Sequence, residues 1–375
     1  MALLHLAHRA LPGLVRAVTV DHGLRAESGA EAAGVAAFCA GLGIPHQTLH
    51  WDGPAPAGNL MDQARRARLR LIGAWAQGLG LTDVLLGHTA DDQAESFVMN
   101  LTRAAGLDGL AGLRPDFLAE GVRFRRPLLA ITRAELRDYL RAAGISWIED
   151  PSNENDRFTR ARVRKALAVL APLGLDAATI ARSARNLAQV RHGLQAEIAA
   201  LARDRVTERA GGLSLPPALL AGLPDEMQRR LLIAALRWIG GADHPPREAG
   251  LDRLRARLAA GQGAVLAGAR FSFDRSGLTI YREARALQGA VPQGALWDGR
   301  WRLAGAQVQG ATLAALGPEG LKLCPDWRAH GPRAALIASP ALWLGAELIA
   351  APLAGLNPKY RALLSQSFAE FILSH

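Results

Sequence analysis

The sequence contains few cysteines, few lysines and no long hydrophobic run. Cys39 and Cys324 are its only cysteines, which excludes a disulfide framework and a metal site rich in thiolates. No apolar stretch approaches the length of a membrane-spanning helix, and the first residues lack the pattern of a secretory signal peptide. We therefore expect a cytoplasmic protein with no membrane partner.

The scarcity of lysine affects how the positive charge is interpreted. All but three of the 44 basic residues are arginine, the exceptions being Lys165, Lys322 and Lys359. The formal net charge of +10 indicates a polyanionic partner such as a nucleic acid. An arginine-rich, alanine-rich composition can also come from the base composition of a genome, so charge alone makes a nucleic acid plausible and no more.

The apolar content is large enough for a substantial core. Half of the 375 residues are hydrophobic, and a chain of this length favours two domains. Predicted strands and helices alternate over the first part of the chain. The strands are expected at 15–20, 44–51, 84–86 and 122–129, and the helices at 1–11, 29–42, 59–77 and 132–143. This alternation predicts an α/β fold with a doubly wound parallel sheet.

The pattern changes after residue 172. A long alanine-rich helix at 176–205 opens a second part that is helical up to about residue 262, with short strands over 263–282. Beyond Trp297 the helical period fades into short apolar runs separated by glycine and proline. We therefore divide the chain into an α/β domain at 1–172, a helical second domain at 173–290, and a small mixed or β-rich part at 291–375.

Two acidic residues follow the strand predicted at 84–86. This strand ends at Gly87-His88, and the next helix carries a capping-box pattern between Thr89 and Asp92. Asp92 and Glu95 share one helix face above the carboxyl edge of the strand, where open α/β sheets bind their ligands. Acidic residues in a first helical turn also offset the helix dipole. The spacing therefore leaves both a capping role and a catalytic role open.

Longer motifs around these residues resemble a known family. The run GHTADDQAES with Asn100 and GLDGLAGL, and the later run WIEDPSN with RARVRK, are similar to the two long signatures of the tRNA(Ile)-lysidine synthetases. These are N-type PP-loop ATP pyrophosphatases. The sequence departs from the family at Ser96, Leu69 and Ala161, where threonine, an aromatic residue and asparagine are usual. The resemblance is specific over residues 15–170.

The resemblance implies an adenine nucleotide alpha-hydrolase-like fold and a ligase that forms a C–N bond. Enzymes of this family attach L-lysine to C2 of the wobble cytidine (position 34) of the isoleucine tRNA with a CAU anticodon. ATP adenylates the C2 oxygen, and the ε-amine of lysine then displaces AMP. ATP and Mg²⁺ are thus the implied co-substrate and cofactor. The sequence leaves open whether the chain forms a homodimer.

Site residues carry over from the family position by position. Asp92 and Glu95 are the implied carboxylates, which accept the amine proton, stabilise positive charge or hold the lysine ammonium. Arg68 and Arg160 are expected to contact phosphate or the adenylate. The expected nucleotide-binding residues are Asp21, His22, Gly87 and His88, and the expected tRNA or phosphate contacts are Arg65, Arg162, Arg164 and Lys165. A solvated helix face and a structural histidine remain alternatives for the basic residues and for His22.

One family element is not found in the sequence. In the family, a strand and a Ser-Gly-Gly-x-Asp-Ser loop precede a helix that begins M-A-L-L-x-L, and the loop holds the pyrophosphate of ATP. This sequence opens with MALLHL and contains no Ser-Gly-Gly. We expect the loop to be encoded upstream of Met1, and we expect the chain as written to be impaired in catalysis.

Two alternative functions stay open. Another PP-loop tRNA-modifying enzyme is one, although a thiolase that uses a sulfur carrier or cluster needs paired cysteines, and an amidotransferase-type relative needs an ammonia-supplying domain. A non-catalytic, truncated PP-loop protein that binds RNA is the other. ATP–pyrophosphate exchange would separate this binding protein from an enzyme.

Overall fold

The computed structural model describes residues 1–23, 28–51, 60–147, 159–216, 218–242, 244–274 and 277–374. The chain divides into two compact units, Met1–Arg191 and His192–His375. The long helix α8 (Ala177–Arg205) contributes residues to both units. The finer division predicted at 172 and 290 stays a prediction.

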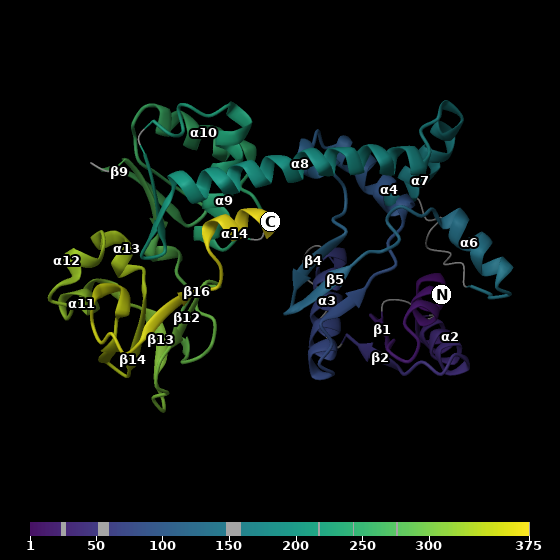
Figure 1. Cartoon of the computed structure of the whole chain (residues 1–375), viewed down its shortest axis with the longest axis horizontal. Coiled ribbons are helices and arrows are strands. Elements are labelled where there is room, and N and C mark those ends of the chain that lie inside the picture. Colours follow the sequence, from purple (N-terminus) through teal and green to yellow (C-terminus); the bar gives the residue numbers. More distant parts are fainter. Residues whose placement is uncertain are drawn as a thin grey trace. The chain divides into compact units, whose positions relative to one another are not determined.

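The first unit alternates strands and helices (Figure 1). Its strands are β1 (Ala17–Asp21), β2 (His46–His50), β3 (Asp83–Leu85), β4 (Asp116–Ala119) and β5 (Val122–Arg125). Its helices are α1 (Ala2–Ala10), α2 (Ser28–Gly41), α3 (Leu60–Gly78), α4 (Ala90–Leu101), α5 (Leu107–Leu110), α6 (Arg133–Ala142), α7 (Thr159–Leu170) and η2 (Ala171–Leu173), followed by the start of α8. The predicted α/β order is therefore confirmed.

The strands of the first unit form two sheets in the described residues. β1 pairs with β2 in parallel, and β3 pairs with β5 in parallel. β4 joins the outer side of β5 as an antiparallel strand, which the sequence did not predict. Glu120 and Gly121 connect β4 to β5 with φ values of +48° and +69°, the signature of a tight hairpin turn.

Helix α3 covers one face of these strands. Gly73 of α3 lies so close to the hairpin that a Cβ there would collide with Cβ of Glu120. Gln77 of the same helix donates a hydrogen bond of 2.5 Å to the Glu120 carbonyl. The apolar core beneath consists of Ile72, Ala76, Val84, Leu86, Val122 and Phe124, with Val18 and Val20 of β1 packed against it. This packing holds the ends of β1 and β3 next to α3.

The second unit contains more β structure than the sequence predicted. Its strands are β6 (Thr207–Arg209), β7 (Gly212–Leu215), β8 (Ala264–Leu266), β9 (Ala269–Asp274), β10 (Gly277–Arg282), β11 (Val291–Pro292), β12 (Trp301–Ala304), β13 (Thr312–Ala315), β14 (Pro340–Leu344), β15 (Glu347–Ala350) and β16 (Arg361–Leu364). Its helices are the end of α8, α9 (Asp225–Gly240), α10 (Glu248–Ala259), η3 (Ala284–Ala286), α11 (Gly317–Lys322), α12 (Trp327–His330), α13 (Arg333–Ile337), η4 (Pro352–Ala354) and α14 (Phe368–Ser374).

The sheets of the second unit are antiparallel. Five strands pair in the order β6-β7-β10-β9-β8. β8, β9 and β10 lie within 263–282, where short strands were expected, whereas β6 and β7 were not expected. The β-rich C-terminal region is confirmed by the order β11-β13-β14-β15 and by the pair β12-β16. The last helix, α14, returns to the core of α8, α9 and the five-stranded sheet, where it places Phe368, Phe371 and Ile372.

None of the described helices is by itself both long and apolar enough to cross a membrane. Residues Thr159–Leu173 and Ala177–Arg205 pass that test only when they are joined across a bend of 96°.

Candidate active site

The two carboxylate oxygens of Asp92 have different partners, one in the helix cap and one in the site. The backbone N–H and the hydroxyl of Thr89 each donate to Oδ2 of Asp92 at 2.8 Å. The other oxygen, Oδ1, accepts a hydrogen bond of 2.9 Å from Nη2 of Arg133. Burial alone raises the pKa of Asp92, but Arg133 and the Thr89 donors outweigh burial, and the net pKa lies below the ordinary value. Asp92 is therefore ionised at neutral pH.

Glu95 is enclosed by arginines. Glu95 is 1% exposed. Its Oε1 lies 3.0 Å from Nη1 of Arg133 and 2.5 Å from Nε of Arg164. Nε of Arg160 is 3.9 Å from Oε2. A buried carboxylate is tolerated only when it is paired in this way. The predicted shared face of Asp92 and Glu95 is thus the face that receives the guanidinium of Arg133.

Arg133 was missed by the sequence analysis. It is the first residue of α6, and its backbone N–H donates to Oδ2 of Asp91 at 2.7 Å. Its two terminal nitrogens divide between Asp92 and Glu95. Burial lowers the pKa of Arg133, but the neighbouring carboxylates raise it above the ordinary value. The capped Thr132 marked the helix start, but nothing in the sequence marked a contact with residues some forty positions away.

The charge of Arg68 acts on two histidines whose pKa values are lowered, His22 and His88. His22 follows β1, and its pKa is lowered by burial and then by the charge of Arg68. His88 follows β3, and its pKa falls to about 4 through burial, then through Arg126, with Arg68 and Arg160 adding to the effect. Among the described residues, Nδ1 of each histidine is buried without a hydrogen-bond partner.

The other residues expected at the nucleotide shape the loops. Oδ1 of Asp21 accepts a hydrogen bond of 2.9 Å from the N–H of Gly23, which is the main reason why the pKa of Asp21 is lowered. The ring of His22 packs edge-on against Trp51 with centroids 5.8 Å apart. Gly87 is exposed and faces Leu3 of α1.

Arg126 is a second basic residue that the sequence did not single out. It is 7% exposed, its Nη1 donates to the Arg114 carbonyl at 2.7 Å, and its guanidinium lies 4.4 Å from the centre of the Phe117 ring. Its Nε has no partner. Burial and the charge of Arg65 lower its pKa to about 10, so it remains a cation at neutral pH. Arg65, expected from the sequence to contact tRNA or phosphate, is thus close enough for its charge to act on Arg126.

Helix α7 separates the predicted basic cluster into two sets. Arg160 and Arg164, one turn apart, approach Glu95. Arg162 and Lys165 are exposed, and Nη2 of Arg162 donates to the Thr159 hydroxyl at 3.3 Å. The motif residues 148–158, and Leu24-Arg25 after β1, lie outside the described residues.

The GLDGLAGL run is held in place by α4. Gln93 accepts from the N–H of Leu113 at 2.6 Å and donates to its carbonyl at 3.2 Å. Asn100 donates to the Gly109 carbonyl at 2.8 Å. Gly112 has φ +70°, and a Cβ there would collide with Oε1 of Gln93, so glycine is required. This part of the motif is structural and fixes the chain that follows α4.

Comparison with known proteins gives the family. Residues 1–170 match the family model described as a PP-loop domain. A tRNA(Ile)-lysidine synthase of Ruegeria pomeroyi is 49% identical over 383 residues, which cover 100% of this chain and 91% of that protein. The chain belongs to the tRNA(Ile)-lysidine synthase family. The synthase of Hyphomonas neptunium is 38% identical over 307 residues, covering 78% of this chain and 80% of that protein.

A solved structure is also similar, at a greater distance. The U34-tRNA thiolase NcsA from Methanococcus maripaludis matches with a TM-score of 0.43 and 17% identity, over 50% of this chain and 68% of that chain.

Membership in the lysidine synthase family implies the use of ATP. The described site suits ATP because it contains cationic side chains and buried ring nitrogens. Arg68, Arg126 and Arg160 can face phosphate oxygens, for which the planar guanidinium is well shaped. The neutral histidines present buried nitrogen atoms, and the carboxylates of Asp92 and Glu95 can hold a cation.

Proposed function

We propose that this protein ligates L-lysine to C2 of the wobble cytidine of the isoleucine tRNA with a CAU anticodon, using ATP and giving lysidine. The observation that carries the proposal is the carboxylate pair Asp92–Glu95, held by Arg133 at the start of α4. It lies in a chain that matches a lysidine synthase along its whole length.

The binding of ATP is assigned to the loops after β1 and β3. The unpartnered Nδ1 atoms of His22 and His88 fit the polar edge of a nucleotide, because a neutral imidazole has one donor and one acceptor nitrogen. Arg68 and Arg126 would face its phosphates. Mg²⁺ would arrive with ATP, bound mainly by phosphate oxygens and water. Within the described ranges, no cluster of three or more His, Cys, Asp and Glu residues forms a metal site.

The two carboxylates would take different parts in lysine transfer. Asp92, whose pKa is lowered, is a weak base and suits the role of counter-ion for the lysine ammonium. Glu95 is almost fully enclosed and suits the role of proton acceptor once Arg160 and Arg164 turn toward phosphate. The arginines would then stabilise the charge that develops on the leaving AMP.

The basic residues that face away from Glu95 are assigned to the tRNA. Arg162 and Lys165 are exposed on α7 and can contact the RNA backbone without disturbing the carboxylates. A homodimer and a cytoplasmic location stay predictions.

The test is lysine incorporation into a transcript of the CAU-anticodon isoleucine tRNA, measured with AMP and pyrophosphate release. The assay is run with and without L-lysine, and we expect AMP release that depends on lysine and on this tRNA. If the protein binds the tRNA and incorporates no lysine, it is an RNA-binding protein and the proposed activity is wrong.

A further inference from the structure

Arg300 is a buried cation of the second unit that the proposed function does not use. Arg300 is 5% exposed. It follows a tight turn in which Asp298 and Gly299 have φ values of +49° and +65°, and which backbone hydrogen bonds between Trp297 and Trp301 close. The turn fixes the direction of the Arg300 side chain.

The guanidinium of Arg300 has few polar partners. Nη2 donates to the Gly211 carbonyl at 2.8 Å, and Nε has no hydrogen-bond partner in the part of the chain that the structure describes. The group lies over the indole ring of Trp238 at 4.5 Å, an arrangement that holds it flat. Burial lowers the pKa of Arg300 to about 10, so the group is still charged at neutral pH.

No carboxylate in the described part of the chain forms an ion pair with Arg300. Asp298 and Glu208 are near enough to raise the pKa of Arg300, and both have other partners. Asp298 is engaged by Arg282, whose Nε and Nη2 lie 2.8 and 2.9 Å from its two oxygens. Oε1 of Glu208 accepts a hydrogen bond of 2.7 Å from the N–H of Phe368. Oδ1 of Asp298 also accepts from the N–H of Gln288 at 3.2 Å. A buried charge without a counter-ion is costly, and such a charge is normally paired or bound to a ligand.

Arg300 lines a cavity of about 190 Å³ in the second unit. A second cation, Arg237, lines the same cavity. Its Nε donates to the Ala242 carbonyl at 3.4 Å, and its guanidinium lies 5.6 Å from the centre of the Phe371 ring. Ser365, which is exposed, adds a hydroxyl, and Gly241 and Gly299 leave part of the wall without side chains. Among the described residues, the lining thus contains two positive groups and no acidic residue.

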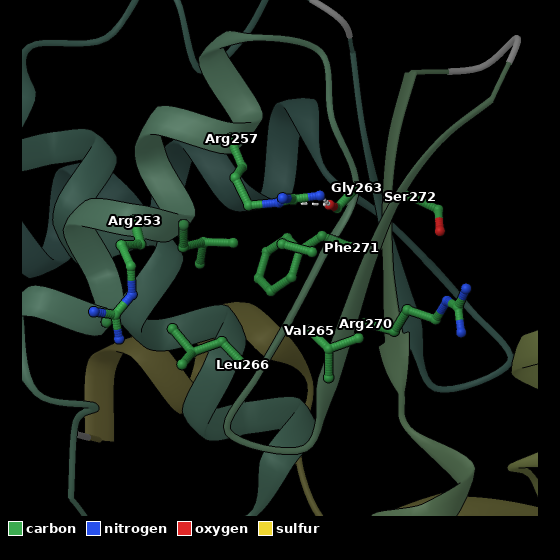
Figure 2. Close-up of a pocket in the computed structure, with 11 residues that line it drawn as sticks. Arg253, Arg257, Gly263, Val265, Leu266, Arg270, Phe271 and Ser272 are labelled. Carbon is green, nitrogen blue, oxygen red and sulfur yellow. Dashed lines mark hydrogen bonds between the residues drawn. The ribbon is translucent and has the colours of Figure 1, made fainter.

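The larger hollow of the second unit is built differently. It has a volume of about 600 Å³ and lies along α10, β8 and β9. Arg257 there already donates from Nε and Nη2 to the Gly263 carbonyl at 3.0 and 2.8 Å. Figure 2 shows the Phe271 ring pointing toward α10, whereas Arg270 points the opposite way, so the arginines do not converge.

We propose that the cavity between Arg237 and Arg300 is a binding site for a phosphate group. Phosphate matches the fork of a guanidinium, and its charge offsets the unpaired cation in a region of low dielectric. The phosphate belongs either to a bound RNA or to a small molecule such as inorganic phosphate or a nucleotide.

The test titrates inorganic phosphate into the full chain at constant ionic strength, with chloride as the replaced anion, and follows the thermal midpoint. We expect a saturable rise for the wild-type protein. Arg300→Met should raise the half-saturating phosphate concentration at least about tenfold, as expected for the loss of one charge-assisted pair. Arg302→Met is the matched control, because Arg302 is exposed and lies outside the cavity; its titration should equal that of the wild type.

The thermal midpoint without phosphate is an independent test of the buried charge. In chloride alone, Arg300→Met should melt at or above the wild-type midpoint, because the variant removes a buried charge that forms no ion pair with a described residue. A wild-type protein without a saturable rise, or an Arg300→Met variant with the wild-type titration, would overturn the proposal. If Arg300→Met does not fold, Arg237→Met takes its place, with the same expected weakening and the same overturning result.

The source of the phosphate is decided by tRNA binding. If the group belongs to RNA, Arg300→Met should weaken tRNA binding and reduce its salt slope by roughly one unit, and inorganic phosphate should compete. An unchanged tRNA affinity together with the phosphate-dependent midpoint assigns the site to a small phosphate compound.

Discussion

At the scale of single residues, one arginine organises the acidic part of the site. Arg133 divides its guanidinium between Asp92 and Glu95, which lie one helical turn apart on α4. Two carboxylates this close repel each other unless a cation lies between them. The spacing in the sequence showed that the two acids share a helix face. The cation comes from another helix, α6, so the residues around the two acids do not predict it.

The first prediction concerns the stability that Arg133 supplies. Arg133→Ala should lower the free energy of unfolding at pH 7 by about 1–3 kcal/mol, the cost of leaving buried polar groups unsatisfied. The ionised form of Asp92, whose folded pKa is lowered, stabilises the protein above the ordinary aspartate pKa of about 3.9, and this contribution is lost as the pH falls through the folded pKa. The difference between variant and wild type in urea unfolding should therefore shrink below about pH 4.

Arg141→Ala on the same helix is the control for this measurement. Arg141 is exposed and pairs with Asp138 on the surface, so its loss should cost less than about 1 kcal/mol. If the difference in free energy of unfolding between Arg133→Ala and the wild type stays constant from pH 7 to about pH 3, Arg133 acts through packing and not through the carboxylates.

The second prediction concerns catalysis by the same pair. Asp92→Asn and Glu95→Gln should each abolish lysine transfer in single-turnover assays, since neither amide can hold an ammonium or accept its proton. Asp91→Asn is the matched control, because Asp91 points to the backbone N–H of Arg133. Transfer at the wild-type rate by either of the first two variants would remove that residue from the mechanism.

At the scale of elements, the structure sorts the basic residues of α7 by face. Arg160 and Arg164 face Glu95, while Arg162 and Lys165 face solvent. The sequence placed all four in one cluster, because the two signatures show which residues are near each other along the chain and not which partner each one meets.

The third prediction follows from this division of α7. The double variant Arg162→Ala, Lys165→Ala should weaken tRNA binding and flatten its salt dependence by roughly one slope unit for each phosphate that the protein no longer neutralises. Arg162→Ala alone should change the free energy of unfolding by less than about 0.5 kcal/mol, as for ordinary exposed positions. Lys322→Ala, an exposed lysine on α11, controls for the removal of a positive charge. An unchanged salt slope would mean that this face of α7 is only solvated.

Much of the first unit was predictable, and the failures have physical causes. Helices such as α6, with caps and terminating glycines, were placed within one or two residues. β4, β6 and β7 were missed because they are three or four residues long and depend on hairpin partners. Their turns carry Glu120-Gly121 and Ala210-Gly211 at positive φ, and alanine and glutamate give no turn signal there.

At the scale of the whole molecule, the two units have separate apolar cores. The core of the first unit lies between α3 and the strands β1, β3 and β5. The largest core of the second unit joins α8, α9 and the five-stranded sheet to α14, the last helix of the chain. The alternation of strands and helices predicted the first core, but the contribution of α14 to a core that begins at Ile198 lies beyond the reach of local patterns.

The fourth prediction tests this contribution of α14. Phe368→Ala should destabilise the second unit by about 3–5 kcal/mol, because Phe368 is 1% exposed and packs on Trp238. Hydrogen exchange should become faster in peptides from 192–374 and stay unchanged in peptides from 1–191. Phe273→Ala, at a position that is 40% exposed, is the control. Equal acceleration in both units would show that they unfold as one.

The place of α14 also determines when the second unit can fold during synthesis. The core of the first unit is complete once Phe124 has left the ribosome, so that unit can begin to fold early. The core that includes Ile198 and Leu236 must wait for Phe368 and Ile372 at the far end of the chain. Until then its apolar faces remain uncovered, so the nascent second unit is the part of this protein most dependent on chaperones and most prone to aggregate if translation stops early.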